Sequence, residues 1–239
     1  MDDATTDSLT TPLNQSSIAM ASTRYASALA VASSIGFIVF GVTVGSQFVP
    51  VDSLYAWHPT LMSVAIALCG TSSALGVYAR TIPPSSARLR AFWTHMGLNV
   101  IGGLCWLFGA YAIYANKRKS GKAHFTSNHG VVGALSTALV LCAALPLGDL
   151  SFGALGMLAR IDSILGTRWS RHLASVKRAH RLSSHLAMCL GIVAASMRTG
   201  HASIGYGEAG RIVADFALWG GALALGISAL STPEWNRIK

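Results

Sequence analysis

Six long apolar runs constrain this chain more than any other feature of its sequence. A helix needs about 20 apolar residues to cross the hydrocarbon core of a bilayer. Segments of about that length cover residues 26–48, 57–78, 91–114, 129–147, 179–197 and 212–230. None shows the period-two alternation of a membrane β-strand, so helices are the favoured spanning elements. We therefore expect an all-α membrane protein with six transmembrane helices, the middle four forming a bundle.

The composition indicates that lipid covers most of the exterior. Charged residues make up only 11% of the chain and hydrophobic residues 52%, whereas a soluble domain carries about 25% charged residues. The net charge of +9 lies mainly between the apolar runs, as in loops that flank a membrane. No spacing typical of a nucleic-acid-binding module accompanies it, so we expect no nucleic-acid partner. The four cysteines lie in separate runs without a C-x-x-C motif, which favours buried free thiols.

The domain organisation follows from the runs and from the basic residues between them. Residues 1–24 are expected to form a disordered cytoplasmic tail, residues 25–232 the transmembrane domain and residues 233–239 a C-terminal tail. Roughly twice as many Lys and Arg flank the side that holds both termini, so the positive-inside rule places the termini in the cytoplasm. Part of the long connection at residues 148–178 is expected to lie on the membrane surface.

Four of the eight histidines begin successive apolar runs. They are His58, His95, His129 and His180. Because consecutive spans are antiparallel, His58 and His129 share one depth in the membrane, and His95 and His180 share another. One histidine at a helix end is often only an interfacial polar residue, but four in matched alternation favour two sites in the bundle core.

Paired imidazoles suit a haem iron better than zinc. Two imidazole nitrogens about 4 Å apart fill both axial positions at nitrogen–metal distances of about 2 Å, whereas zinc takes four ligands. Runs two to five hold no Asp or Glu, and their cysteines lie nine or more positions from the histidines. Two bis-histidine centres suit single-electron transfer rather than oxygen binding. Small residues that would admit a macrocycle, or serve only helix packing, are Gly97, Gly102, Gly103, Gly130, Gly133, Ala187 and Gly191.

His185 is the main alternative to His180 as a ligand. It lies five residues further along, about 140° around the helix, so the two rings are not expected to face one haem. His180 is preferred because it lies nearer the end of the span. A second function compatible with the intramembrane histidines is that of a proton-coupled transporter or channel, which haem content would distinguish.

Three strings in the sequence resemble motifs of the eukaryotic cytochrome b561 family, in its short form with the b561 domain alone. They are WHPTLM at residues 57–62, GKAHFTSNHG at 121–130 and KRAHR at 177–181, within a resemblance that covers about residues 25–232. The resemblance implies two haem b groups per chain, held by His58 with His129 and by His95 with His180. Ser183 and Ser184 partly match the Ser-Gly that follows the fifth-helix ligand, which supports His180 over His185.

The resemblance also implies an ascorbate-dependent transmembrane oxidoreductase. Members similar to this chain pass electrons across the lipid bilayer from cytoplasmic ascorbate to monodehydroascorbate or ferric iron, often as homodimers. Because ascorbate is an anion, its site should carry cations. Arg88, Arg90 and Arg171 are the cytoplasmic candidates, although membrane topology or lipid headgroups also account for them. On the other side, Lys122 and His124 would face the acceptor, and His124 could transfer a proton.

Overall fold

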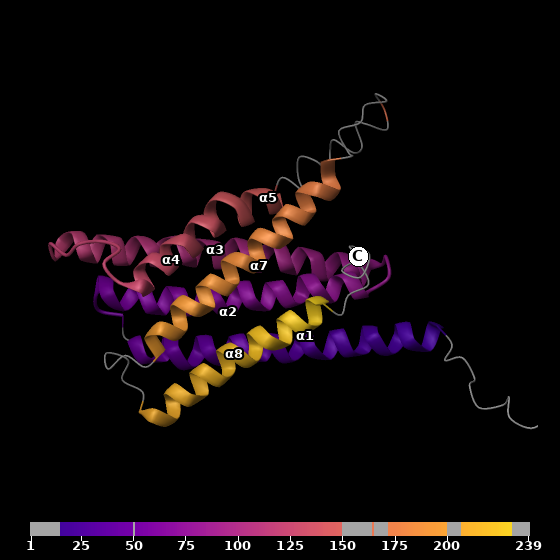
Figure 1. Ribbon diagram of the computed structural model, residues 1–239, viewed down its shortest axis with the longest axis horizontal. Coiled ribbons are helices and arrows are strands. Elements are labelled where there is room, and N and C mark those ends of the chain that lie inside the picture. Colours follow the sequence, from indigo (N-terminus) through magenta and orange to yellow (C-terminus); the bar gives the residue numbers. More distant parts are fainter. Residues whose placement is uncertain (1–14, 50, 150–163, 165–171, 200–206, 231–239) are drawn as a thin grey trace, which may run out of the picture.

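The computed structural model describes residues 15–49, 51–149, 164, 172–199 and 207–230 (Figure 1). Every regular element in these ranges is helical, which confirms the all-α fold. The tail expected at residues 233–239, the middle of the 148–178 connection and Arg171 lie outside the described residues.

The helices follow the six apolar runs. They are α1 (Gln15–Gly45) with a 3-10 turn η1 (Ser46–Phe48), α2 (Leu54–Thr81), α3 (Ser86–Lys119), α4 (Asn128–Leu139) with a π-helical turn η2 (Val140–Ala144) and α5 (Leu145–Asp149), α7 (Leu173–Thr199) and α8 (Glu208–Leu230). The start of α1 at Gln15 differs from the disordered tail expected up to residue 24. Residues 15–25 contain no Gly or Pro, so nothing in them stops the helix.

Serine side chains begin three of these helices. Ser53, Ser85 and Ser127 are the N-caps of α2, α3 and α4, and each side-chain oxygen accepts a hydrogen bond from a backbone N–H in the first turn. Such a cap satisfies one of the donors that a helix leaves unpaired at its start. The caps fix where α2 and α4 begin, and so place His58 and His129 within the first two turns.

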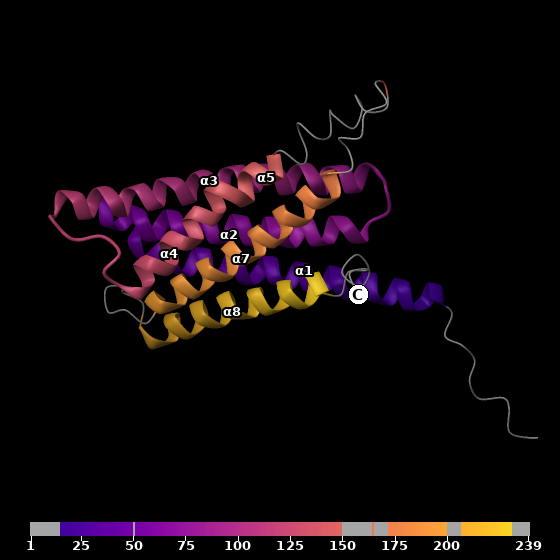
Figure 2. The ribbon, with the colours of Figure 1, turned by 45° about the horizontal axis from the view of Figure 1, so that its top comes forward.

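Within the described residues, five helices are long and apolar enough to span a membrane: residues 24–48, α2, α3, residues 128–148 and α8. The remaining long helix, α7, has 27 residues, but its first half carries several basic residues together with His180 and His185. α7 runs beside the other helices through the body of the bundle (Figures 1 and 2), and its polarity is concentrated where the predicted ligand lies.

The bundle consists of two closely packed helix pairs that contact each other only sparsely. α2 packs along α3, and α4 packs along α7, while α1 covers α2 and α8 covers α1. The start of α1 and the end of α8 lie at one end of the bundle, together with the α2–α3 connection, and the α3–α4 connection lies at the other (Figure 2). The predicted antiparallel order of the spans is therefore present, and space remains between the two pairs.

A proline explains the π-helical turn, which the apolar pattern did not predict. Pro146 has no N–H to donate, and its ring crowds the carbonyl four residues earlier. The helix accommodates this by widening over η2, where the Leu145 N–H donates to the carbonyl of Val140, five residues back. The fourth span is therefore continuous from Asn128 to Asp149 but contains a wide turn in its second half.

Glycine allows α1 and α8 to approach each other closely. A Cβ on Gly36 would lie 2.7 Å from the Ala217 carbonyl oxygen and 2.9 Å from Cα of Gly221. Buried Ser33 adds a 2.8 Å hydrogen bond from its hydroxyl to the Gly221 carbonyl. Because the atoms facing Gly36 are backbone atoms, only a shift of a whole helix would make room for a side chain.

We therefore expect Gly36→Ala to lower the free energy of unfolding by about 1–3 kcal/mol, the usual cost of overpacking. Gly220→Ala is the matched control, since its Cβ would meet no atom within 4 Å. Unfolding of both variants in mixed detergent micelles, followed by circular dichroism, measures the difference. Equal stability of the two variants would contradict close packing of α1 on α8.

Candidate functional site

Two cavities lie between the α2–α3 pair and the α4–α7 pair. The outer cavity, at the end of the bundle with the α3–α4 connection, has a volume of about 490 Å³, and both His58 and His129 line it. The inner cavity, toward the α2–α3 connection, has a volume of about 90 Å³, and both His95 and His180 line it. The structure therefore brings together the four predicted histidines in the two predicted pairs, one pair in each cavity.

The distance between His58 and His129 suits a metal ion between them. Their ring centroids are 6.2 Å apart, and the ring planes cross at 77°. With nitrogen–metal distances of about 2 Å, and with each ring centre about 1 Å behind its nitrogen, two axial imidazoles place their centroids roughly 6 Å apart. The observed separation agrees with this value. The angle between the ring planes is no obstacle, because two rings can be rotated about a shared nitrogen–metal–nitrogen axis without changing their separation.

In the α2–α3 pair, each histidine donates a hydrogen bond to the backbone of the other helix. Nδ1 of His58 lies 2.9 Å from the Gly109 carbonyl oxygen of α3, and Nδ1 of His95 lies 2.7 Å from the Ser72 carbonyl oxygen of α2. Because a carbonyl only accepts, Nδ1 carries the proton in both rings. Nε2 is therefore the nitrogen available to a metal, which is the usual arrangement for a ligating histidine.

The α4–α7 pair repeats this arrangement. Nδ1 of His129 donates to the carbonyl of Ala194 in α7 at 2.8 Å, and Nδ1 of His180 donates to the carbonyl of Ala144 at 2.7 Å. Ala144 is the last residue of the π-helical turn, so the irregular part of the fourth span supports a predicted ligand. All four histidines thus have the same protonation pattern, and each ring is held by the helix beside it.

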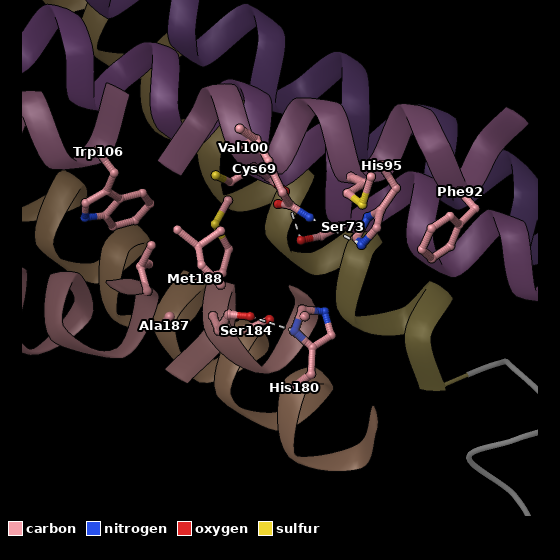
Figure 3. A pocket seen from close by; sticks show the side chains of 16 residues that line it. Cys69, Ser73, Phe92, His95, Val100, Trp106, His180, Ser184, Ala187 and Met188 are labelled. Carbon is pink, nitrogen blue, oxygen red and sulfur yellow. Dashed lines mark hydrogen bonds between the residues drawn. The ribbon is translucent and has the colours of Figure 1, made fainter. Parts of the chain in front are cut away.

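His95 has two further polar neighbours. The buried hydroxyl of Ser72 donates to the His95 carbonyl at 2.7 Å and accepts from Nδ1 at 2.9 Å. The amide of Asn99 lies 3.3 Å from Nε2, so a metal at Nε2 would displace that amide. Figure 3 shows His95 and His180 facing each other from opposite walls of the inner cavity.

Two glycines that were not predicted from the sequence make room for the rings of His95 and His180. A Cβ on Gly76 would lie 3.1 Å from the ring of His95, and a Cβ on Gly148 would lie 2.9 Å from the ring of His180. Among the small residues predicted to admit a macrocycle, Gly130, Gly133 and Gly191 line the outer cavity and Ala187 lines the inner one. Gly102 and Gly103 instead pack against Cys69 and Leu145.

His185 does not line either cavity. Its Nδ1 lies 2.6 Å from the carbonyl of Arg181, one turn back on the same helix, so the ring is tied to α7 rather than to a neighbouring helix. Its Nε2 is buried without a hydrogen-bond partner in the described part of the chain. The structure therefore places His180, and not its rival, beside the inner cavity.

The cations nearest the outer cavity differ from those that the sequence suggested. Lys117 and Arg198 line it together with His124, whose ring stacks on Tyr114 at 4.8 Å between centroids. Lys122 is exposed and does not line it. Lys117 and Arg198 end the α3 and α7 helices, so only the fold reveals that they converge on one cavity.

On the opposite side, the two described arginine candidates lie in the first turns of α3. Arg88 is half-buried and Arg90 is exposed, and neither lines the inner cavity.

Known proteins resemble this chain over most of the bundle. A family model described as eukaryotic cytochrome b561 matches residues 57–205, a segment that contains all four paired histidines. The transmembrane reductase CYB561D2 of Mus musculus is 32% identical over 163 residues, which cover 66% of this chain and 64% of that protein. The Homo sapiens protein of the same name is 32% identical over 178 residues, covering 71% of this chain and 69% of its own length.

A more distant relative is the probable transmembrane reductase CYB561D1 of Mus musculus, 31% identical over 110 residues, which cover 43% of this chain and 44% of that protein. The match with the first of these relatives thus spans just under two thirds of its length. No solved structure gives a significant match.

The close approach of Gly148 to His180 generates a test of the inner site. In Gly148→Ala the new methyl group pushes the ring of His180 away from its carbonyl partner. If His180 is a haem ligand, the affinity for that haem should fall by about 10–100-fold, as when an outer-shell partner of a metal ligand is lost. The control is Gly97→Ala, whose Cβ would meet nothing within 4 Å. Haem transfer to excess apomyoglobin measures the affinity, and a Gly148→Ala protein that holds haem as tightly as the control would contradict the packing.

Proposed function

The chain belongs to the eukaryotic cytochrome b561 family, and from that premise we propose that it carries single electrons across a lipid bilayer through two haem b groups. The electrons pass from cytoplasmic ascorbate to monodehydroascorbate or ferric iron on the other side. A haem iron with histidine at both axial positions supplies reversible one-electron oxidation and reduction. His58 with His129, and His95 with His180, are the proposed axial ligands.

The observation that carries this proposal is the shared protonation pattern of the four histidines. Each Nδ1 donates to a backbone carbonyl of the adjacent helix. The Nδ1 bonds thereby leave Nε2 as the unprotonated nitrogen of each ring, the one that can bind a metal. A haem at either pair would then take one histidine ligand from each side of the cavity. A proton path, the alternative function, would instead require polar groups linked from one histidine pair to the other.

The residues proposed to handle the substrates form two groups, one for the donor and one for the acceptor. Ascorbate is an anion, and Arg88, Arg90 and Arg171 are the proposed cations of its cytoplasmic site. At the other end, Lys117 and Arg198 attract an anionic acceptor toward the outer cavity, with Lys122 outside it. His124 would deliver the proton that accompanies reduction of a radical. This assignment places both chain termini in the cytoplasm, and a homodimer is proposed from the family alone.

Haem content and its loss in single variants test the proposal directly. Purified protein should contain two haem b groups per chain and show a b-type α-band after addition of ascorbate. His180→Ala should remove one haem and leave the other, because the remaining imidazole supplies only one axial bond. His185→Ala is the matched control and should keep both. Purified protein without a Soret band would exclude the proposal. Loss of a haem in His185→Ala but not in His180→Ala would show that His185, and not His180, is the ligand.

His124→Phe separates proton delivery from electron delivery at the outer end. Phenylalanine retains a ring that stacks on Tyr114 but carries no proton. We expect slower reoxidation of the reduced protein by monodehydroascorbate, with an unchanged rate for ferricyanide, which takes up no proton. Stopped-flow spectroscopy of the α-band measures both rates. An equal slowing with the two acceptors would instead indicate that His124 only shapes the cavity.

A further inference from the structure

Trp106 of α3 lines both the outer and the inner cavity. It lies eleven residues after His95 and three residues before Gly109, whose carbonyl holds His58. At about 1.5 Å per residue, this places the indole roughly 16 Å along the helix from the inner ligand. In Figure 3 Trp106 closes the end of the inner cavity that lies away from His95 and His180. The indole therefore stands between the two histidine pairs.

Three helices hold the indole in one orientation. Its Nε1 donates a 3.0 Å hydrogen bond to Oγ1 of Thr137 in α4, which satisfies the one polar atom of the ring at a depth where water is excluded. On α7, a Cβ at Gly191 would lie 2.6 Å from Cη2 of the indole, so only glycine leaves space for the ring. Trp106 is only 1% exposed, which makes it a fixed wall between the cavities.

From this placement we infer that Trp106 is the bridge through which an electron passes between the two haem sites. The inference rests on the proposed function. One electron would leave a reduced haem held by His95 and His180 and would arrive at an oxidised haem held by His58 and His129. Trp106 has the same number of electrons before and after the transfer. No proton moves, so its buried N–H stays bonded to Thr137. The π orbitals of an aromatic ring give stronger electronic coupling between the two sites than an aliphatic side chain, whose electrons are more tightly held.

Two alternative roles for Trp106 predict different effects of substitution. If Trp106 only fills space, any well-packed side chain of sufficient volume would serve. If it only separates the cavities, its removal would alter haem binding and not the transfer between the sites. Substitutions must therefore be read both for haem binding and for electron movement.

The experiment uses full-length, haem-loaded protein in liposomes, with ascorbate on the cytoplasmic side only. The wild type should show a fast reduction of the first haem, followed by a second phase in which the electron reaches the other haem. In Trp106→Leu we expect the first phase to remain and the fast second phase to be lost. Trp106→Phe keeps an aromatic ring and should retain the fast second phase. Trp219→Leu, a change at a half-exposed tryptophan of α8 that lines neither cavity, is the control.

Two measurements independent of electron transfer accompany the kinetics. Haem per chain reports whether both sites are filled, and the Soret circular dichroism couplet reports the relative placement of the two haems. A Trp106→Leu protein with two haems, an unchanged couplet and a wild-type second phase would overturn the inference. If Trp106→Leu loses a haem, Trp106→Phe decides: a slow second phase with both haems in place would also overturn it. Failure of the proposed function is distinct, because the wild type itself would then lack two haems.

Discussion

The hydrogen bond from each histidine Nδ1 to a helix carbonyl is the interaction on which the arrangement of this bundle depends. The hydrocarbon region offers no water to a polar N–H, so each ring must find a partner within the protein. The carbonyls have a second lone pair beyond the one used in their own helix. The bonds are reciprocal: α2 donates to α3 and α3 to α2, and the fourth span and α7 do the same. Each helix pair is thereby joined by two such hydrogen bonds, one near each end of the bundle.

These hydrogen bonds also determine the direction of Nε2 in each ring. Nε2 lies on the opposite side of the imidazole ring from Nδ1. When Nδ1 is bonded within its own helix pair, Nε2 is therefore directed toward the space between the α2–α3 pair and the α4–α7 pair. The two helix pairs contact each other sparsely. Glycines at positions such as Gly76 and Gly148 let the histidine rings lie close to the helices that hold them. The same bonds thus account for the helix rotation, the cavities and the histidine pairs.

The sequence predicted what depends on hydropathy and direction, and missed what depends on rotation and register. Six runs and their antiparallel order were enough to pair His58 with His129 and His95 with His180. The carbonyl partners, the wide turn before Pro146 and the convergence of Lys117 with Arg198 depend on which residues of two helices lie at the same height. Apolar runs without a strong amphipathic pattern leave that open. Trp106 was missed for the same reason, since its role depends on two cavities that meet at one side chain.

The two histidine pairs share one geometry but differ in their surroundings, and the differences bear on the direction of electron flow. At the inner pair, the Ser72 hydroxyl accepts from Nδ1 of His95 in addition to the backbone carbonyl. A second acceptor would increase the electron density that this imidazole gives to a haem iron bound at Nε2, and so would favour the oxidised state of that iron. At the outer pair, Lys117 and Arg198 line the cavity, and positive charge favours the state with the extra electron. One cation, Arg80, acts on His95 of the inner pair, whereas two, Arg198 and Lys117, act on His129 of the outer pair. Under the proposed function both differences would lower the potential of an inner haem relative to an outer one, and so would favour electron flow from the side of the α2–α3 connection to the side of the α3–α4 connection.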